Sequence, residues 1–143
     1  MARDREIEAH IAGVDLFKDL SRGQLKRLAG AAKEVTHPAG RVMSTEGLGG
    51  LAFHYILAGR ATVSREGREL RTLGPGDYFG EISMIDGRPR SATVTAVDEM
   101  TVIAIPHGDF ESVVKDDPAF AHQLLKTLCA RLREAEARAA ALA

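Results

Sequence analysis

The chain has 143 residues, of which 45% are hydrophobic, and it carries a net charge of −1 with a single cysteine, Cys129. This charge balance argues against a broad basic face for nucleic acid, and no apolar run approaches the ~20 residues that span a bilayer. One cysteine cannot form an internal disulfide, and the charged N-terminal sequence is unlike a signal peptide, so we expect a cytoplasmic protein with no membrane contact.

The N-terminal part of the chain, residues 1–34, is predicted to be helical. Residues 5–11 suit a short helix, and Ser21 and Gln24 have the spacing of a capping box at the start of another. Apolar residues then recur at helical intervals, at Leu25, Leu28, Ala29 and Ala32. His37-Pro38 and Gly40 end this pattern, because proline disfavours helix in the residue before it.

Residues 35–106 read as a series of short strands. Strand-like runs occur at 41–45, 52–59, 60–66, 68–74, 91–97 and 100–105. The residues around Gly67 are typical of a hairpin turn, and Pro75 between two glycines indicates another tight turn. Several short strands at close spacing predict an antiparallel β-roll or jelly-roll barrel.

The C-terminal part, residues 107–143, is again helical. Residues 108–116 suit one short helix, and residues 118–142 a long one, with Pro118 in its first turn. A heptad-like apolar seam follows the long helix, at Ala121, Leu125, Leu128, Leu132, Ala135, Ala139 and Leu142. The seam packs on the chain's own barrel or meets a second copy or a partner protein. We therefore expect one α+β domain over residues 1–143, mainly β, with helices at both ends.

One short stretch, "GEISMIDGRPRSATV" at residues 80–94, brings together groups that suit a nucleotide. Gly80 lets the backbone approach a ligand, and the first amides of a helical turn after it are free donors for an anion. Arg90 follows Glu81 by nine residues and offers a forked charge for phosphate. Glu81 only accepts hydrogen bonds, which suits a sugar hydroxyl. The alternative is a Glu81–Arg90 ion pair that closes a loop.

The longer stretch "YFGEISMIDGRPRSATV", residues 78–94, closely resembles the phosphate-binding cassette of cyclic nucleotide-binding domains. Such domains occur in catabolite-activator-type regulators, protein kinase A regulatory subunits and cyclic-nucleotide-gated channels. The segments "YILAGRATV" (55–63) and "LGPGDYFGE" (73–81) are similar to family strands as well. The resemblance extends from about residue 14 to residue 133 and implies a regulatory module without catalysis.

The resemblance also implies a role for each cassette residue. Arg90 is expected to pair with the cyclic phosphate and Glu81 with the ribose 2′-hydroxyl. Other expected ligand contacts come from the cassette, the barrel wall and the last helix: Phe79, Gly80, Ile82, Ser83, Ser91, Ala92, Val63, Leu73 and Arg131. Of these, Val63 and Leu73 are expected to face the base, and Arg131 is the candidate to cover it from the long helix. The expected ligand is cAMP, with cGMP open because the Ser91 hydroxyl suits both.

The chain departs from one family pattern on its last helix. Catabolite activators have a Thr-Ser pair where this chain has Ala135-Glu136. Some bacterial channel domains instead place an arginine over the base, and the resemblance to them makes Arg131 the candidate for this contact. The alternative is that Arg131 is a solvated arginine on the helix face. A bound nucleotide is expected to close the helix that begins at Pro118 over the base, through a hinge near residues 105–114.

Two other classes of function compete with a cyclic-nucleotide sensor. A cupin-like metal enzyme on a similar barrel needs clustered ligands, but the five histidines show no His-x-His spacing. We therefore expect no metal and no cofactor. A transcription regulator of the catabolite-activator type needs a helix-turn-helix after the long helix, and the chain ends at Ala143. The chain is thus expected to be a stand-alone sensor or the sensor of a larger regulator, channel or enzyme.

Overall fold

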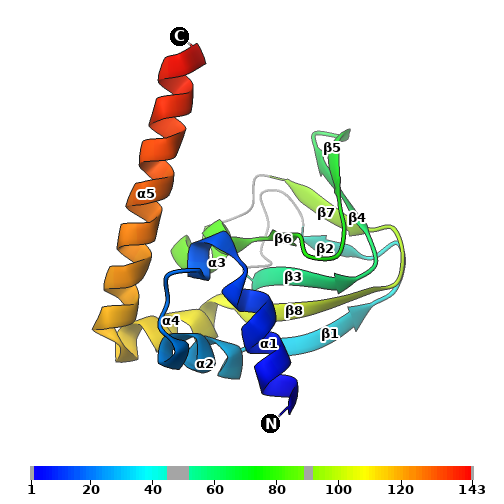
Figure 1. Ribbon diagram of the computed structural model, residues 1–143. Coiled ribbons are helices and arrows are strands. Elements are labelled where there is room, and N and C mark those ends of the chain that lie inside the picture. Colours follow the sequence, from blue (N-terminus) through cyan, green and yellow to red (C-terminus); the bar gives the residue numbers. More distant parts are fainter. Residues whose placement is uncertain (1, 45–51, 89–91, 143) are drawn as a thin grey trace. The chain divides into compact units, whose positions relative to one another are not determined.

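The computed structural model describes residues 2–44, 52–88 and 92–142 (Figure 1). The helices within these ranges are α1 (Ala2–Ala12), the 3-10 helix η1 (Asp15–Phe17), α2 (Arg22–Gly30), α3 (Glu81–Asp86), α4 (His107–Asp116) and α5 (Pro118–Leu142). The strands are β1 (Lys33–His37), β2 (Val42–Ser44), β3 (Ala52–Ala58), β4 (Ala61–Arg65), β5 (Arg68–Leu73), β6 (Tyr78–Phe79), β7 (Thr93–Ala96) and β8 (Met100–Pro106). This combination of helices with antiparallel sheets confirms the predicted fold class.

The chain forms two compact units. The helical unit contains residues 1–29 and 112–143, and the β unit contains residues 30–111. The chain passes between the units twice, the second time within α4. The expectation of one functional domain over residues 1–143 stays a prediction.

The β unit consists of two four-stranded sheets in which every pairing is antiparallel. One sheet has the order β1-β8-β3-β6 and the other the order β2-β7-β4-β5. Side chains from both sheets form one buried cluster, made of Ile56, Ala61, Val63, Leu73, Phe79, Val94, Ala96, Met100 and Val102. Alternate residues of β4 and β7 point into this cluster, as expected for strands with one buried face. The core of the β unit therefore lies between its two sheets.

The predicted hairpin at Gly67 joins β4 to β5 and is confirmed. Arg65 pairs with Arg68, and Glu66 and Gly67 between them both have positive φ, as in a type I′ turn. The register then shifts at a bulge between Ser64 and Val63, so that Val63 pairs with Arg71.

The helical unit confirms the predicted capping box. The Ser21 amide donates to Gln24 Oε1 at 2.8 Å, and the Gln24 amide donates to Ser21 Oγ at 3.2 Å. The prediction that this helix continues to Ala32 is wrong, because α2 ends at Gly30 and β1 begins at Lys33. Glycine is a poor helix former, which favours the end of the helix at Gly30. The residues from Lys33 onward instead pair with β8, for example Val35 with Val102.

The long helix α5 begins at Pro118, as predicted, and contacts η1 within the helical unit. Its buried residues are Phe120, Leu124 and Thr127. Thr127 Oγ1 lies 3.2 Å from the Gln123 carbonyl oxygen and 3.4 Å from Asp19 Oδ2. The predicted seam lies on a different set of positions. Three of its four leucines, Leu125, Leu132 and Leu142, are exposed by 61%, 59% and 88%, and the fourth, Leu128, is half-buried.

His37, at the end of β1, is expected to make the free energy of unfolding depend on pH. It is half-buried, and burial lowers its pKa, as does the charge of Arg41 to a smaller extent. Protonation is then easier in the unfolded chain, so the stability that His37 contributes is complete above its unfolded pKa of about 6.5 and is lost as the pH falls. We expect the free energy of unfolding in urea to fall between about pH 7.5 and about pH 5.5, and to fall less in His37→Gln.

The matched control for this pH experiment is His122→Gln, at an exposed position of α5. It should follow the wild type at both pH values. An equal loss of stability in His37→Gln and wild type would contradict the assignment to His37.

Candidate functional site

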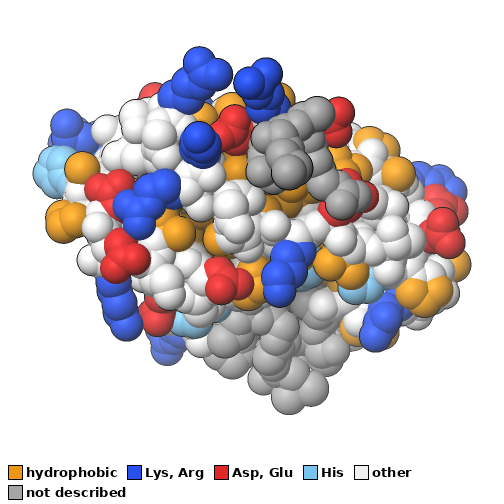
Figure 2. Space-filling view, turned by 90° about the horizontal axis from the view of Figure 1, so that it is seen from below, with side chains coloured by type: hydrophobic (Ala, Val, Ile, Leu, Met, Phe, Trp, Pro, Cys, Tyr) orange, Lys and Arg blue, Asp and Glu red, His pale blue; other side chains and the backbone are white. Residues whose placement is uncertain are grey.

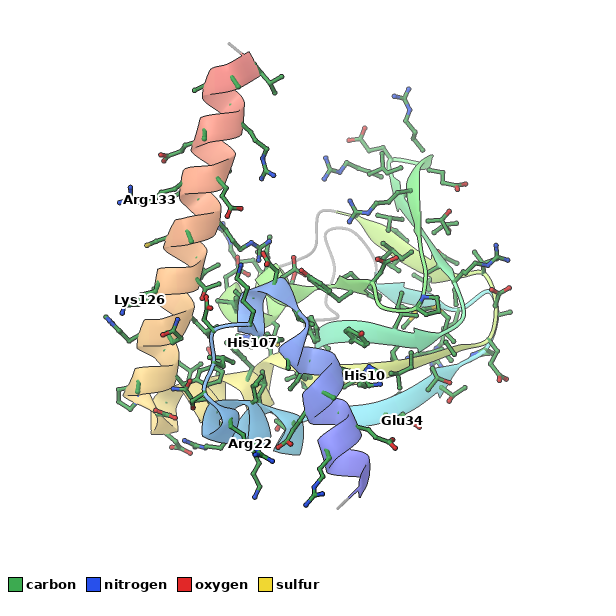
Figure 3. The ribbon with its side chains drawn as sticks, in the orientation of Figure 1. His10, Arg22, Glu34, His107, Lys126 and Arg133 are labelled. Atoms are coloured by element: carbon green, nitrogen blue, oxygen red, sulfur yellow. The ribbon has the colours of Figure 1, made fainter. Side chains whose placement is uncertain are left out.

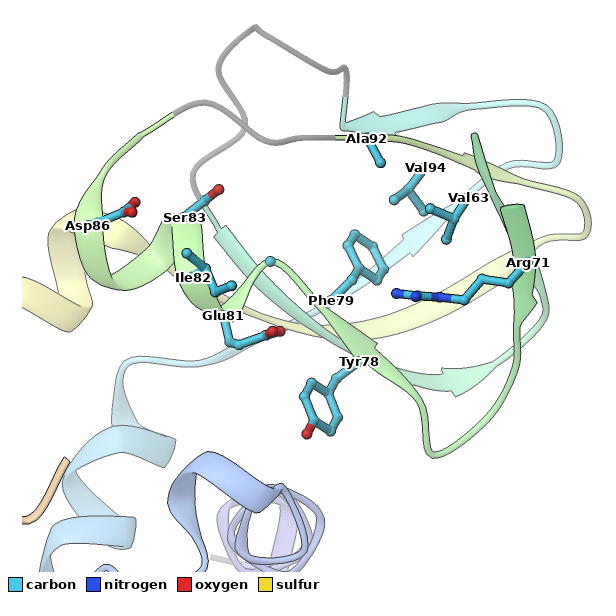
Figure 4. A pocket seen from close by; sticks show the side chains of 11 residues that line it. Val63, Arg71, Tyr78, Phe79, Glu81, Ile82, Ser83, Asp86, Ala92 and Val94 are labelled. Atoms are coloured by element: carbon cyan, nitrogen blue, oxygen red, sulfur yellow. The ribbon is translucent and has the colours of Figure 1, made fainter. Parts of the chain in front are cut away.

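A pocket of about 320 Å³ opens in the β unit beside α3. Its lining residues come from both sheets and from α3: Val63, Arg71, Tyr78, Phe79, Gly80, Glu81, Ile82, Ser83, Asp86, Ala92 and Val94. Figure 4 shows the short side chains of Val63, Ala92 and Val94 together on one wall and α3 on another. The volume and the mixture of apolar walls with a few polar groups suit a small organic ligand.

The backbone at Gly80 sets the start of α3 at this pocket. Gly80 has φ 86° and ψ 9°, a left-handed conformation that favours glycine. The Met84 amide donates to the Gly80 carbonyl at 3.0 Å, and Glu81, Ile82 and Ser83 form the first turn. The first amides of a helix have no partner within it, so this turn presents backbone donors at the pocket.

The side chains of α3 divide between the pocket and the protein interior. Ser83 is 5% exposed and Met84 is completely buried, whereas Ile82 is 64% exposed. Met84 therefore anchors the helix, and Ile82 offers an apolar surface at the pocket.

The turn before β6 positions the aromatic side chains of the pocket. The Gly74 amide donates to Asp77 Oδ2 at 2.8 Å, and the Asp77 amide donates to the Gly74 carbonyl at 2.9 Å, which confirms the tight turn predicted at Pro75. In the β3–β6 pair, His54 lies opposite Phe79, and their rings stack with centroids 4.8 Å apart. This stack fixes the ring of Phe79 in the pocket wall.

Charged side chains extend into the pocket from opposite walls. Figure 4 shows the Arg71 side chain entering from β5 and the Glu81 side chain pointing toward it from the start of α3. Arg71 supplies only donors and Glu81 only acceptors. A polar ligand between them can therefore be held at two ends, with apolar walls beside it.

Most of the predicted ligand-binding residues come together at this pocket. Those that line it are Val63, Phe79, Gly80, Glu81, Ile82, Ser83 and Ala92. Leu73 does not line it, because this side chain pairs across the sheet with the buried Ala61 and belongs to the core, where it is 6% exposed. Arg131 lies half-buried on α5 in the helical unit. Arg90 and Ser91 lie outside the described residues.

Four lining residues were not among the predicted contacts. Tyr78 and Val94 are part of the cassette sequence, and Asp86 is the last residue of α3. Arg71 is the residue that the sequence signals least, because it lies outside the cassette and its place depends on the bulge in β4–β5.

The profile of the cyclic nucleotide-binding domain family matches residues 34–117. The chain belongs to this family. It is 34% identical to a cyclic nucleotide-gated potassium channel of Rhizobium etli over 121 residues, which are 85% of this chain and 34% of the channel. It is 30% identical to a CRP-like cAMP-activated global transcriptional regulator of Mycobacterium tuberculosis over 128 residues, 86% of this chain and 57% of the regulator.

Solved structures of this family share the fold. The crystal structure of the N-terminal domain of a transcriptional regulator from Streptomyces coelicolor matches with a TM-score of 0.78 and 32% identity, over 88% of this chain and 94% of that domain. The expected family membership is thus confirmed, and the chain is a cyclic nucleotide-binding domain of the kind found in regulators and channels. It spans between a third and three fifths of the length of those two curated relatives.

The described residues of this cyclic nucleotide-binding domain also bear on a metal site and on a membrane-spanning helix. Among residues 2–44, 52–88 and 92–142, no group of three or more His, Cys, Asp or Glu side chains is placed to hold a metal ion. No helix in the same described ranges has the length and hydropathy needed to cross a membrane. On the face shown in Figure 2, basic and acidic side chains are interspersed.

Proposed function

We propose that this domain binds cAMP in the pocket at α3 and acts as a regulatory module without catalysis. The observation that carries the proposal is the convergence of the first turn of α3, the Glu81 carboxylate and the apolar wall of Val63, Phe79 and Val94 on one pocket. The names of the relatives support cAMP, since the Mycobacterium tuberculosis regulator is cAMP-activated and fungal relatives are regulatory subunits of cAMP-dependent protein kinase.

In this proposal the cassette binds the sugar-phosphate part of the nucleotide. Arg90 pairs with the cyclic phosphate, which the amides of Ile82, Ser83 and Ala92 and the Ser91 hydroxyl also contact. Glu81 accepts from the ribose 2′-hydroxyl. The base lies against the apolar wall, with Arg131 of α5 as the candidate cover.

The same pocket favours cGMP as a second candidate ligand because of Arg71. A guanidinium forms two parallel hydrogen bonds with the O6 and N7 acceptors of guanine, whereas adenine presents one acceptor and one donor at the same edge. Arg71 enters the pocket beside Val63, which belongs to the wall proposed for the base.

Titration of the wild type and Arg71→Ala with cAMP and cGMP tests both candidates. We expect Arg71→Ala to lower the affinity for cGMP by about 5- to 150-fold, the value of a bidentate base contact, and to change the affinity for cAMP by less than about threefold. Arg68→Ala is the matched control, because Arg68 is on the same strand, is exposed and does not line the pocket. Equal effects of Arg71→Ala on both nucleotides would remove the case for guanine recognition, and no binding of either by the wild type would refute the proposed function.

We further infer that the nucleotide acts by shifting a conformational equilibrium. Binding draws the cassette together, and α4 transmits the change to α5. A ligand shifts such an equilibrium only as far as its affinities for the two states differ. The exposed leucines of the seam on α5, Leu125, Leu132 and Leu142, form the surface through which a second copy or a partner protein would respond.

We also propose that the module is cytoplasmic and belongs to a larger protein. The relatives are longer than this chain, which supports a sensor that belongs to a larger regulator or channel. A single cysteine supports a cytoplasmic location. The net charge of −1, from 19 basic and 20 acidic residues, supports a function without nucleic-acid contact by this domain.

A further inference from the structure

His107, the first residue of α4, makes a polar contact with the last turn of α3. Its Nδ1 lies 2.6 Å from the Met84 carbonyl oxygen, and its Nε2 lies 3.3 Å from Glu111 Oε1 one turn further along α4. The side chain is 22% exposed. Figure 3 labels it at the start of α4. All of these residues belong to the β unit.

The Met84 carbonyl needs a donor from outside α3. In a longer helix the Met84 carbonyl would accept from the amide of Arg88, four residues later. Here the Arg88 amide donates to Asp86 Oδ1 instead, at 2.9 Å. The Ser83 carbonyl is satisfied by the Gly87 amide at 2.9 Å. Because carbonyl and carboxylate oxygens only accept, the imidazole donates from Nδ1 to Met84, and its protonated form also donates from Nε2 to Glu111.

The imidazole ring also packs tightly against the backbone that follows α3. A Cβ atom on Gly87 would lie 3.0 Å from His107 Nε2 and 3.1 Å from Cε1. The helix α3 has only six residues, which is too short to persist without tertiary contacts. Met84 fixes it from the interior and His107 fixes its C-terminal end.

We propose that His107 is a positioning residue for the nucleotide pocket and the link through which the pocket and α4 influence each other. The end of α3 opposite His107 carries Glu81, Ile82 and Ser83, which line the pocket. A contact that orients α3 for the ligand must, by reciprocity, be strengthened when the ligand is bound. The backbone of α4 continues from Glu111 into the helical unit at Ser112, so a change at His107 passes directly into that helix. This inference rests on the proposed cyclic-nucleotide binding.

Two substitutions at this position separate the hydrogen bond from the space that the ring fills. The amide of His107→Asn can occupy the place of Nδ1 and donate to Met84, whereas the longer His107→Gln places its amide near Nε2 and leaves the Met84 carbonyl without this donor. We expect His107→Gln to weaken the binding of both cAMP and cGMP by about 2- to 12-fold, the value of one hydrogen bond, and His107→Asn to retain affinity within about twofold of the wild type. His122→Gln on α5 is the matched control and should bind as the wild type does.

Amide hydrogen exchange of the wild type, His107→Gln and His107→Asn reports the stability of α3 and α4 directly, which binding affinity does not. Without nucleotide, His107→Gln should speed exchange of the Met84 and Gly87 amides, and His107→Asn should not. With nucleotide, exchange in the first turns of α4 should slow in the wild type and in His107→Asn but not in His107→Gln.

The outcomes distinguish this inference from the proposed function. If the wild type binds either nucleotide, and His107→Gln keeps wild-type affinity and exchange in α3 and α4, the role of His107 is refuted while the function stands. Loss of affinity in both variants alike would also refute the hydrogen-bond role. If the wild type binds neither nucleotide, the proposed function fails, and unchanged exchange at Met84 and Gly87 in His107→Gln would refute the positioning of α3 as well.

Discussion

Replacing Arg90 by alanine is expected to weaken cyclic nucleotide binding by about 30- to 4,000-fold. Removing one partner of a buried, hydrogen-bonded charge pair costs roughly 2–5 kcal/mol, because the other charge is left without its counterion. Here the charge left behind would be the cyclic phosphate, which the resemblance to the family cassette assigns to Arg90. Glu81→Ala should have a smaller effect, since it removes a contact with a neutral hydroxyl. Calorimetric titration of each variant measures these losses.

Arg88→Ala is the matched control for Arg90→Ala. Arg88 lies two residues earlier, is exposed, and contributes a backbone amide to Asp86 that the substitution leaves in place. Its affinity should stay close to that of the wild type. Equal losses in the two variants, or unfolding of Arg90→Ala, would instead favour a structural ion pair between Glu81 and Arg90.

Gly59→Ala is expected to lower the free energy of unfolding by about 2–5 kcal/mol. Gly59 lies in the turn between β3 and β4 with φ +88°, where an L-residue with a side chain is strained. A Cβ atom there would overlap the Glu99 carbonyl oxygen and lie 2.9 Å from Met100 Cα. The close approach is part of the fold, because the Arg60 carbonyl beside it accepts from the Val97 amide at 2.8 Å. Urea unfolding followed by circular dichroism measures the loss.

Gly40→Ala separates the two causes of this destabilisation. Gly40 has φ +85°, close to that of Gly59, but a Cβ atom there would meet no atom within 4 Å. Its loss should be only the backbone strain, about 1–2 kcal/mol. If Gly59→Ala and Gly40→Ala lowered the free energy of unfolding equally, the close contact of Gly59 with Glu99 and Met100 would not contribute to the loss in Gly59→Ala.

The sequence predicted those turns and helix ends that are determined by residues close to each other in the chain. The capping box at Ser21 and Gln24, the hairpin at Gly67 and the start of α5 at Pro118 each follow from residues within one turn of the chain. The pocket residues of the cassette were predictable for a different reason, because a continuous stretch of sequence supplies Phe79 to Ser83.

The features that the sequence did not predict depend on contacts between distant residues. Four of the five residues of β1 are exposed, so no alternation marks it, and it becomes a strand by pairing with β8. Counting back from the two-residue hairpin would place Leu70 opposite Val63, but the bulge replaces it with Arg71 and so brings a cation into the pocket. In the same way, the contact of His107 with Met84 joins residues 23 positions apart.

The most direct test of cyclic nucleotide recognition is a calorimetric titration of the wild-type chain with cAMP, cGMP and 5′-AMP. The linear nucleotide has the same base and ribose as cAMP, but its phosphate is not closed onto the ribose 3′-oxygen. We predict a Kd of about 1 μM or tighter for at least one cyclic nucleotide, and binding of 5′-AMP at least about tenfold weaker than that of cAMP. Absence of binding by both cyclic nucleotides, or equal affinity for cAMP and 5′-AMP, would contradict recognition of the cyclic phosphate by this pocket.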